Sequence, residues 1–277
     1  MQKLFSIISR LFEKVTSKRL FYLTPNKHNS LGKTAAWSPL GFWYVGNVYE
    51  SADIAYGIAQ NGQVEKDDTA LVVKILSNLD RPVVYDIGAN TGYYGILSAT
   101  KFGAQVHSFE PIPENISCIN ESARINGASD KVTAHTIALG SQQDVLELSL
   151  AGSGSTLTKK FLGNTSAVPT LKVAVETLDS FNLPAPHFIK IDVEGYEWEV
   201  LKGARETITK YKPICFIEIA KVFSERNFRH QNWDEIIHFF QALDYQMQRN
   251  TPNGLVDLTE NIPNGVYMYL FTPNKET

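Results

Sequence analysis

The stretch "FIKIDVEGYEWEVLKGA", residues 188–204, begins as a buried strand and becomes acidic where an apolar run would continue. Phe188, Ile189 and Ile191 are typical of a sheet interior, and Asp192 and Glu194 follow at once. Burying an unpaired charge costs about several kcal/mol, so the placement indicates that these two carboxylates face a specific group. A glycine and a helical pattern then close the segment.

Short apolar strands alternate with helical patterns on both sides of this stretch. Strands are predicted at 82–88, 105–111, 132–139, 144–150, 171–181, 187–195, 213–220, 245–250, 254–259 and 266–272, and helices at 64–79, 91–103, 113–127, 196–211 and 232–245. This alternation predicts an α/β fold with a mostly parallel sheet flanked by helices. Ligands bind such sheets at the carboxyl ends of the strands.

The composition is that of an ordinary globular protein, with 43% hydrophobic residues and a net charge of −3 in 277 residues. That length fits one α/β domain with additions, which we place at residues 81–277 after an extension at 1–80. The charge gives no reason to expect a nucleic-acid partner. The histidine and cysteine spacings predict no protein-built metal site, and Cys118 and Cys215 are expected to be small buried thiols, as in a cytoplasmic protein.

Residues 1–21 form the most distinctive part of the extension. Apolar residues recur there with helical spacing, and the segment carries a net charge of about +4. Two interpretations stay open: an amphipathic helix packed on the domain, or a helix in peripheral contact with an anionic membrane, which would be the inner face. No apolar run is long enough to span a bilayer. The rest of the extension is rich in aromatic residues, which favours irregular structure or hairpins over disorder.

The loop "YDIGANTGYYG", residues 85–95, joins the first strand to its helix and brings backbone amides near a ligand. Its glycines do not match the G-x-G-x-x-G pattern of dinucleotide-binding proteins. Glu110 lies 22 residues after Gly88, at the end of the second strand, where an acid suits the two hydroxyls of a ribose. The alternative role for Glu110 is to stabilise the next helix as an acid near its N-terminus, where the carboxylate complements the helix dipole. Asp86 would repel a diphosphate and suits a nucleoside with a positive centre and an amino group, such as S-adenosylmethionine.

Several motifs, taken together, resemble the FkbM-type S-adenosylmethionine-dependent methyltransferases in order and spacing. They are "VVYDIGANTGYYG", "VHSFEPIPEN", "IALG", "TLDSF", "FIKIDVEGYEWEVLKGA" and "PICFIEI", and they cover residues 82–220. The resemblance implies a class I methyltransferase, Rossmann-like fold with a seven-stranded sheet whose last strand is antiparallel. It also implies methylation mainly of hydroxyl oxygens, often on sugars or natural products.

The resemblance carries cofactor roles onto matching positions of this chain. Asp86, Gly88, Asn90 and Gly92 would shape the methionine side, and Glu110 would hold the ribose. Adenine would lie between Pro111 and Ile112 on one face and Ala138 on the other, with Thr136 as the nearest group to read its amine.

Methyl transfer to an alcohol needs alignment and a base that takes the hydroxyl proton. Asp192 is the first candidate for the base, and Glu194 is either a second site acid or a partner of the next helix dipole. Lys190 is a possible charge partner of Asp192, and Glu218 is either a third site acid or a strand-end residue. Two acids can hold a divalent cation, but the sequence shows no third ligand, so we expect no metal.

These features favour an S-adenosylmethionine-dependent O-methyltransferase that acts on a hydroxyl of a glycan, glycolipid or related metabolite. The alternatives are a nicotinamide-dependent oxidoreductase and a non-catalytic binding protein that retains the fold. The expected location is cytoplasmic, with peripheral contact at the inner face of a membrane through residues 1–21 as an extension of that prediction.

Overall fold

The computed structural model describes residues 20–23, 33–47, 52–158, 168–223, 228–258 and 265–274. Residues 1–19, which hold nearly all of the predicted amphipathic segment, lie outside this set, so its two interpretations stay predictions. Within the described residues, no helix combines the length and the apolar character needed to cross a membrane.

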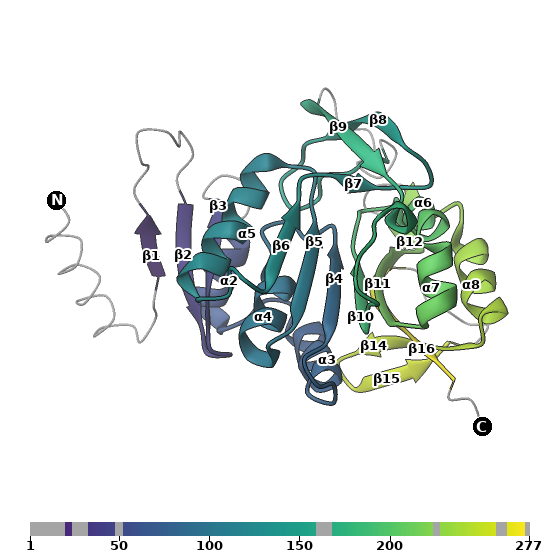
Figure 1. Cartoon of the computed structure of the whole chain (residues 1–277), viewed down its shortest axis with the longest axis horizontal. Coiled ribbons are helices and arrows are strands. Elements are labelled where there is room, and N and C mark those ends of the chain that lie inside the picture. Colours follow the sequence, from purple (N-terminus) through teal and green to yellow (C-terminus); the bar gives the residue numbers. More distant parts are fainter. Residues whose placement is uncertain are drawn as a thin grey trace, which may run out of the picture.

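The central sheet has eight strands in the order β15-β14-β16-β11-β10-β4-β5-β6 (Figure 1). Neighbours from β11 to β6 are parallel, whereas β16 is antiparallel to both β11 and β14. The strands are β4 (Val83–Ile87), β5 (Gln105–Phe109), β6 (Val132–His135), β10 (Phe188–Ile191), β11 (Ile214–Ala220), β14 (Tyr245–Thr251), β15 (Gly254–Asp257) and β16 (Val266–Pro273).

This topology confirms the class I methyltransferase fold expected from the sequence. Seven strands make the expected set, and the last strand of the chain, β16, is the antiparallel one inserted between β11 and β14. The eighth strand, β15, is added at the edge by a hairpin with β14 that turns at Gly254.

Helices cover both faces of the sheet, and the alternation of side chains along each strand decides which helices pack on which face. Val84 and Phe188 pack in one apolar cluster with helices α3 (Lys66–Leu76), α4 (Tyr93–Phe102) and α5 (Pro113–Ile125). Their chain neighbours Tyr85 and Ile189 pack on the opposite face with α6 (Glu197–Gly203), α7 (Arg205–Tyr211) and α8 (Trp233–Ala242). The result is three layers. Cys118 and Cys215 are both buried, as predicted.

Three predicted elements are divided in the structure. The expected strand 171–181 ends at Glu176 and is followed by a 3-10 turn at Leu178–Ser180. The expected strand 132–139 ends at His135, because Ile137 N–H donates to His135 O and turns the chain into β7 (Ala138–Leu139), which joins another sheet. The expected helix 196–211 is broken at Ala204, whose φ of −113° leaves the helical region. The break coincides with a close contact, since a Cβ on Gly203 would lie 1.9 Å from Gly140 O.

Three smaller sheets and two short helices complete the described structure. Strands β7, β8 (Asp144–Ser149) and β9 (Thr170–Glu176) form a sheet above the carboxyl ends of the central strands in the view of Figure 1. The others are the sheet of β1 (Leu20–Leu23), β2 (Lys33–Ser38) and β3 (Phe42–Asn47), the pair β12 (Val222–Phe223) and β13 (Phe228–Arg229), the helix α2 (Ala52–Asn61) and a 3-10 turn at Leu178–Ser180.

The extension shares its apolar core with the central sheet. Phe42 and Tyr44 of β3, Ile58 of α2 and Leu76 of α3 belong to the same buried cluster as Val84 of β4. The aromatic residues of this region therefore make a hairpin and core contacts, as its composition suggests. A domain boundary at residue 80 stays a prediction.

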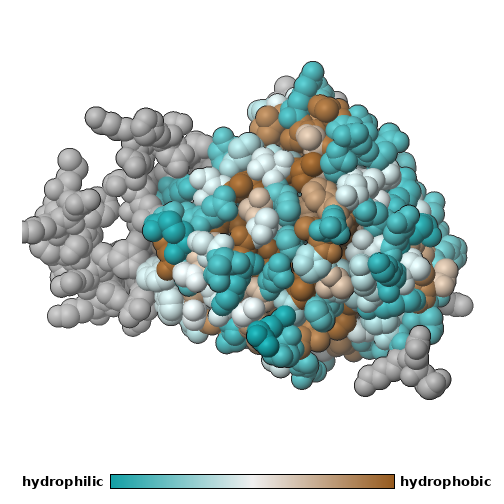
Figure 2. Space-filling model, viewed as in Figure 1, coloured by the Kyte–Doolittle hydropathy of each residue, from teal (hydrophilic) through white to brown (hydrophobic). Residues whose placement is uncertain are grey.

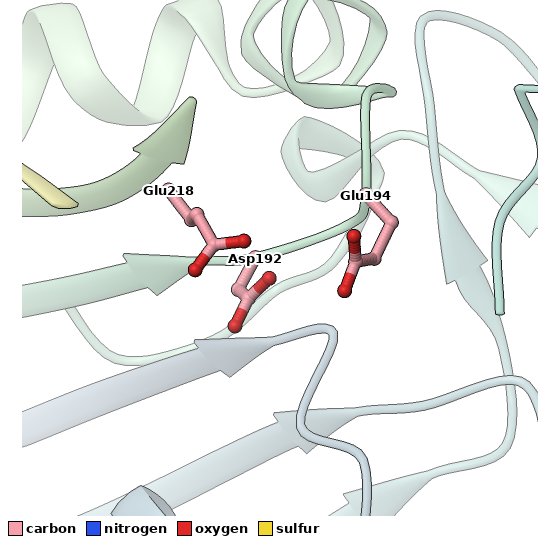
Figure 3. Close-up of side chains that lie close together, drawn as sticks. All are labelled: Asp192, Glu194 and Glu218. Carbon is pink, nitrogen blue, oxygen red and sulfur yellow. The ribbon is translucent and has the colours of Figure 1, made fainter. Parts of the chain in front are cut away.

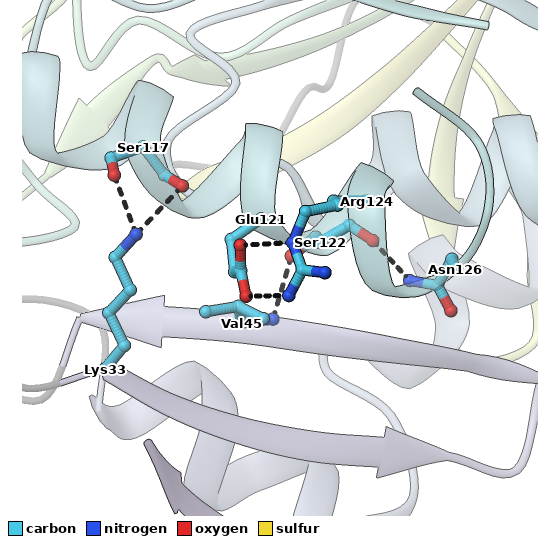
Figure 4. Close-up of polar contacts among 7 residues, drawn as sticks. All are labelled: Lys33, Val45, Ser117, Glu121, Ser122, Arg124 and Asn126. Carbon is cyan, nitrogen blue, oxygen red and sulfur yellow. Dashed lines mark hydrogen bonds and ion pairs between the residues drawn. The ribbon is translucent and has the colours of Figure 1, made fainter. Parts of the chain in front are cut away.

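The free edge of β3 lies against α5, and helix side chains take its backbone hydrogen bonds (Figure 4). Val45 N–H donates to Ser122 Oγ at 2.9 Å. Asn126 binds Trp43 twice, by accepting from its N–H at 2.8 Å and donating to its carbonyl at 2.6 Å. Lys33 Nζ donates to both Ser117 O and Ser117 Oγ. An edge strand satisfied in this way is not open to pairing with another chain.

The surface mixes polar and apolar residues. Hydrophobic groups reach the surface near the centre of the face in Figure 2, separated by hydrophilic residues. Among the residues that the structure describes, the exposed large hydrophobic ones are Val145, Tyr211 and Val256, and they lie on three different elements. Scattered residues of this kind need no functional explanation.

We predict that Asn126→Ala lowers the free energy of unfolding by about 1–3 kcal/mol, because the N–H and carbonyl of Trp43 lose their side-chain partner at the sheet edge. Urea denaturation measures this change. Asn78→Ala is the matched control: it removes an exposed hydrogen bond to Lys74 O at the end of α3, where a change within about 0.5 kcal/mol is expected. Equal effects of the two substitutions would contradict the role assigned to Asn126.

Candidate active site

The loop after β4 and the segment after β10 touch at the carboxyl edge of the sheet. Gly88 has a φ of +72°, and a Cβ there would lie 1.8 Å from the backbone oxygen of Asp192. Asp192 N–H in turn donates to Ile87 O at 3.0 Å. Only glycine fits this contact, which brings the Gly88 loop and the Asp192 carboxylate to the same place.

Glu110 lies directly after β5 and is held from both sides by backbone amides. Its Oε2 accepts from Asn90 N–H at 3.0 Å, and its Oε1 accepts from Ile112 N–H at 2.9 Å. Burial is the largest influence on this carboxyl and raises its pKa to about 7, against the opposing effect of hydrogen bonds from Ile112, Asn115 and Asn90. The structure therefore fixes the Glu110 carboxyl in a single orientation.

A cavity opens at Glu110, and we refer to it as the Glu110 cavity. Six of the predicted cofactor residues line it: Gly88, Asn90, Glu110, Pro111, Ile112 and Ala138. Asn115, Thr156 and Tyr196 also line it and were not predicted. The Asn115 Oδ1 atom is buried and makes no hydrogen bond, so it is free to accept one from a group inside the cavity.

The remaining predicted cofactor residues do not line this cavity. Thr136 is exposed, because the turn between β6 and β7 directs it outward. Gly92 has a φ of +85° and packs against α5, where a Cβ would lie 2.7 Å from Ile119 Cγ1. Thr136 and Gly92 therefore belong to the loops around the Glu110 cavity and do not line it.

Asp86 is 1% exposed and also lies behind the cavity wall. Its Oδ2 accepts from Gly95 N–H at 3.0 Å, whereas its Oδ1 is buried without a hydrogen-bond partner. Burial raises its pKa, and Lys190, its direct neighbour across β4 and β10, acts in the opposite direction. Asp86 therefore holds the first turn of α4 through Gly95 N–H.

Lys190 is 4% exposed and pairs with Asp192 through an Nζ to Oδ2 distance of 2.8 Å. Its ammonium also lies 5.0 Å from the ring centre of Tyr94. Burial lowers the pKa of Lys190, but the combined effect of Asp192, Asp86 and Glu65 outweighs it and raises the pKa. The lysine thus stays charged and anchors Asp192.

Three carboxylates converge at the ends of β10 and β11 (Figure 3). Asp192, Glu194 and Glu218 each offer an oxygen within 4.8 Å of the others. The pKa of Glu218 is raised well above its usual range, first by the charge of Asp192 and then by burial and the charge of Glu194. The structure therefore brings Glu218 into the cluster, which the sequence left as one of two alternatives.

Oxygen ligands of this kind suit Mg²⁺ or Ca²⁺, so Asp192, Glu194 and Glu218 are the residues that could hold a divalent cation. The third ligand that the sequence did not show is Glu218. An acidic cluster alone does not establish a metal, and the expectation of a metal-free site stays a prediction.

A second and larger cavity, the carboxylate cavity, measures ≈ 330 Å³ and contains these acids together with Lys190. Gly88, Asn90, Ser153 and Asp192 line both cavities, so the two adjoin. Glu65 and Tyr94 also line the carboxylate cavity, and Tyr94 Oη donates to Glu65 Oε2 at 2.6 Å. Glu65 belongs to the extension, outside the motifs at residues 82–220, so the sequence did not predict that it lines this cavity.

The family model of the FkbM methyltransferase domain matches residues 86–247. The chain belongs to the FkbM methyltransferase family. The match includes the Gly88 loop, Glu110 and the three clustered carboxylates, so these residues lie within the family domain, whereas Glu65 lies outside it.

A curated relative is the hexuronic acid methyltransferase AglP of Haloferax volcanii, which is 31% identical over 125 residues. That alignment covers 44% of this chain and 49% of the relative, so the chain spans about half of the relative's length.

Structurally similar proteins include the methyltransferase FkbM of Methylobacillus flagellatus KT. Its structure has a TM-score of 0.49 and 21% identity over 69% of this chain and 44% of that chain. An S-adenosylmethionine-dependent O-methyltransferase of Thermotoga maritima has a TM-score of 0.41 and 12% identity over 77% of this chain and 67% of that chain.

We predict that Glu110→Gln changes how stability depends on pH. A carboxyl whose pKa rises from 4.5 to about 7 on folding binds its proton more tightly in the folded state. Its contribution to stability is therefore complete at low pH and is lost as the pH rises from 4.5 to 7, by an amount on the order of 3 kcal/mol. The glutamine variant lacks this loss.

Urea denaturation of both proteins at pH 4.5 and pH 8 tests this. The wild type should lose stability relative to Glu110→Gln between the two conditions, while Asp68, whose pKa is raised to about 6 mainly by burial, contributes equally to both proteins. Stability differences that do not change with pH would show that Glu110 is not the titrating group.

Proposed function

We propose that this chain is an S-adenosylmethionine-dependent O-methyltransferase that acts on a hydroxyl of a glycan, glycolipid or related metabolite. The observation that carries the proposal is the position of Asp192, which lines both the Glu110 cavity and the carboxylate cavity. A carboxylate thus lies at the junction between a nucleoside site and a second polar site.

The residues of the Glu110 cavity fit the nucleoside part of the cofactor. The Glu110 carboxylate accepts two backbone hydrogen bonds and one from the Asn115 side chain, which leaves one of its about four lone-pair sites to accept from a ribose hydroxyl. Pro111, Ile112 and Ala138 would contact the faces of adenine. The unpartnered Asn115 Oδ1 would accept from the adenine amino group, the role that Thr136 is too exposed to take.

S-adenosylmethionine, when bound, supplies an electrophilic methyl group on a positively charged sulfur. Asp192 then takes the proton of the acceptor hydroxyl, because it is the carboxylate common to both cavities. Lys190 holds Asp192 through the 2.8 Å ion pair. Glu218, whose raised pKa favours its protonated form, donates a hydrogen bond to the acceptor, and Glu194 accepts one.

Two further observations support a carbohydrate acceptor. The relative from Haloferax volcanii is named for methylation of a hexuronic acid. The carboxylate cavity is also lined by Tyr93 and Tyr94 beside four carboxyl groups, and aromatic faces with clustered hydrogen-bond acceptors suit a polyhydroxylated ring. Cytoplasmic location and contact with a membrane through residues 1–21 are part of the proposal as well.

Transfer of label from [methyl-³H]-S-adenosylmethionine to fractions of the source cells tests this function. The full chain should label a carbohydrate-containing fraction, and the label should survive mild alkali, because an ether at a hydroxyl resists the base that cleaves a carboxyl methyl ester. Asp192→Asn should lower the rate by about 100-fold or more while it retains cofactor binding. Asp257→Asn is the matched control, since Asp257 is an exposed residue that binds Gln246 and Gln248.

Alkali-labile label would place the methyl group on a carboxylate and contradict the hydroxyl acceptor. Full activity of Asp192→Asn would exclude Asp192 as the base. A parallel run with and without EDTA tests the expectation of a metal-free site.

We also predict that Glu110→Ala weakens binding of S-adenosylhomocysteine about 100-fold, because the hydrogen bonding between Glu110 and the ribose is lost. Isothermal titration calorimetry measures the dissociation constant, and a thermal melt confirms that the variant is folded. Glu121→Ala, which removes a half-buried carboxylate paired with Arg124 on α5, should bind as the wild type does. Unchanged affinity in Glu110→Ala, or tight binding of NAD in place of S-adenosylhomocysteine, would refute the assignment of this cavity.

A further inference from the structure

We infer that Glu197 and His230 are positioning residues that fix the turn carrying Glu194 and thereby orient the cluster of Asp192, Glu194 and Glu218. The inference rests on the proposed function for the use of that cluster. The hydrogen-bond chain that carries it is independent of any ligand, and neither residue lines the carboxylate cavity.

The turn at Glu194 and Gly195 has a backbone that needs external support. Glu194 has a φ of +55° and Gly195 a φ of +93°, so a residue with a large side chain occupies the left-handed region. Such a conformation persists only where its surroundings hold it. Two threonines hold the carbonyls: Thr156 Oγ1 donates to Glu194 O at 2.6 Å and Thr158 Oγ1 donates to Gly195 O at 3.0 Å.

Glu197 holds the amide side of the same turn. It is the first residue of α6, and its Oε1 accepts from Gly195 N–H at 2.8 Å. Its other oxygen, Oε2, lies 2.9 Å from His230 Nε2. Glu197 is 1% exposed and His230 is 4% exposed, so the pair is excluded from solvent.

The hydrogen bonds of His230 determine which of its nitrogens donates. Asn232 N–H donates to His230 Nδ1 at 3.2 Å, which leaves the proton on Nε2 to be donated to Glu197. His230 N–H donates to Lys221 O at 3.1 Å, so the histidine is fixed at its backbone too. A chain of hydrogen bonds therefore runs from the segment after β11, through His230 and Glu197, to the amide next to Glu194.

A buried carboxylate is an expensive way to fill space, and an apolar pair would pack there at lower cost. The position of this pair explains its presence: Glu197 binds the amide that directly follows Glu194, and Glu194 points into the cluster (Figure 3). Loss of the His230 donor would leave one oxygen of the buried Glu197 without a hydrogen bond. The Glu197 side chain would then reorient, and the turn that it binds at Gly195 N–H would shift. Displacement of a reacting group by about 1 Å is sufficient to lower a rate 100-fold.

Three variants of the full chain test the inference. His230→Leu removes the donor, His230→Gln keeps an N–H at the position of Nε2, and Tyr245→Phe is the control. Tyr245 Oη donates one buried hydrogen bond, to Pro213 O at 2.9 Å. Tyr245 belongs to the apolar cluster that also contains Val200 of α6, but it lies away from the turn at Glu194. Loss of its hydroxyl therefore removes a buried hydrogen bond without touching the site.

Two measurements are made on each variant. The first is label transfer from S-adenosylmethionine to the accepting fraction, with the rate at saturation and the apparent KM for each component. The second is hydrogen exchange of the Gly195 amide, followed by NMR after selective ¹⁵N-glycine labelling. We expect His230→Leu to lower the saturating rate 10- to 100-fold with KM for the cofactor within twofold, and to speed exchange of the Gly195 amide at least tenfold. His230→Gln should restore both, and Tyr245→Phe should change neither by more than twofold.

A saturating rate for folded His230→Leu within twofold of the wild type would overturn the inference, as would an equal loss in Tyr245→Phe. Should His230→Leu fail to fold, Glu197→Gln replaces it, and the same results are expected. The glutamine side-chain oxygen can still accept from Gly195 N–H, but its NH₂ group then faces the N–H of His230, so that hydrogen bond is lost. If the wild type transfers no label, the proposed function fails, and unchanged exchange at Gly195 in the variants would separately refute the positioning role.

Discussion

The contact between Gly88 and the backbone of Asp192 is the constraint on which the rest of the site depends. Strands β4 and β10 are parallel neighbours, so their carboxyl ends reach the same edge of the sheet, and the absence of a side chain at Gly88 lets the following segments touch. Any residue larger than glycine would separate them. The Glu110 cavity and the carboxylate cavity adjoin because of this one close approach.

The site concentrates negative charge with little compensation. Asp86, Asp192 and Glu218 all surround Lys190, and the like charges raise the pKa of Glu218 while the lysine opposes that effect. A fold selected for stability alone would place apolar residues at these strand ends. The cost of the cluster indicates that these carboxylates are kept for a reason other than stability.

Two segments outside the central sheet complete the site from different directions. The extension contributes Glu65 to the carboxylate cavity, and Tyr44 of β3 hydrogen-bonds Thr91 of the Gly88 loop. The residues at 151–158 supply Ser153 to both cavities and the two threonines that hold the Glu194 turn. The motif residues therefore supply the carboxylate cluster and Glu110, and less distinctive segments complete the walls of the two cavities.

The sequence by itself determined the fold class, because the alternation of apolar strands with amphipathic helices is a local property, and it placed Gly88, Glu110, Asp192 and Glu194 at strand ends. Only the tertiary structure decided which of these residues meet. Asn115 lines the Glu110 cavity whereas Thr136 does not, and Glu218 lies beside Asp192 and Glu194. From distant segments, Glu65 lines the carboxylate cavity and His230 binds Glu197 behind it. The physical reason is that a strand pattern fixes which side chains face in, whereas turns such as the one after His135 and contacts between strands far apart in the chain fix what each side chain reaches.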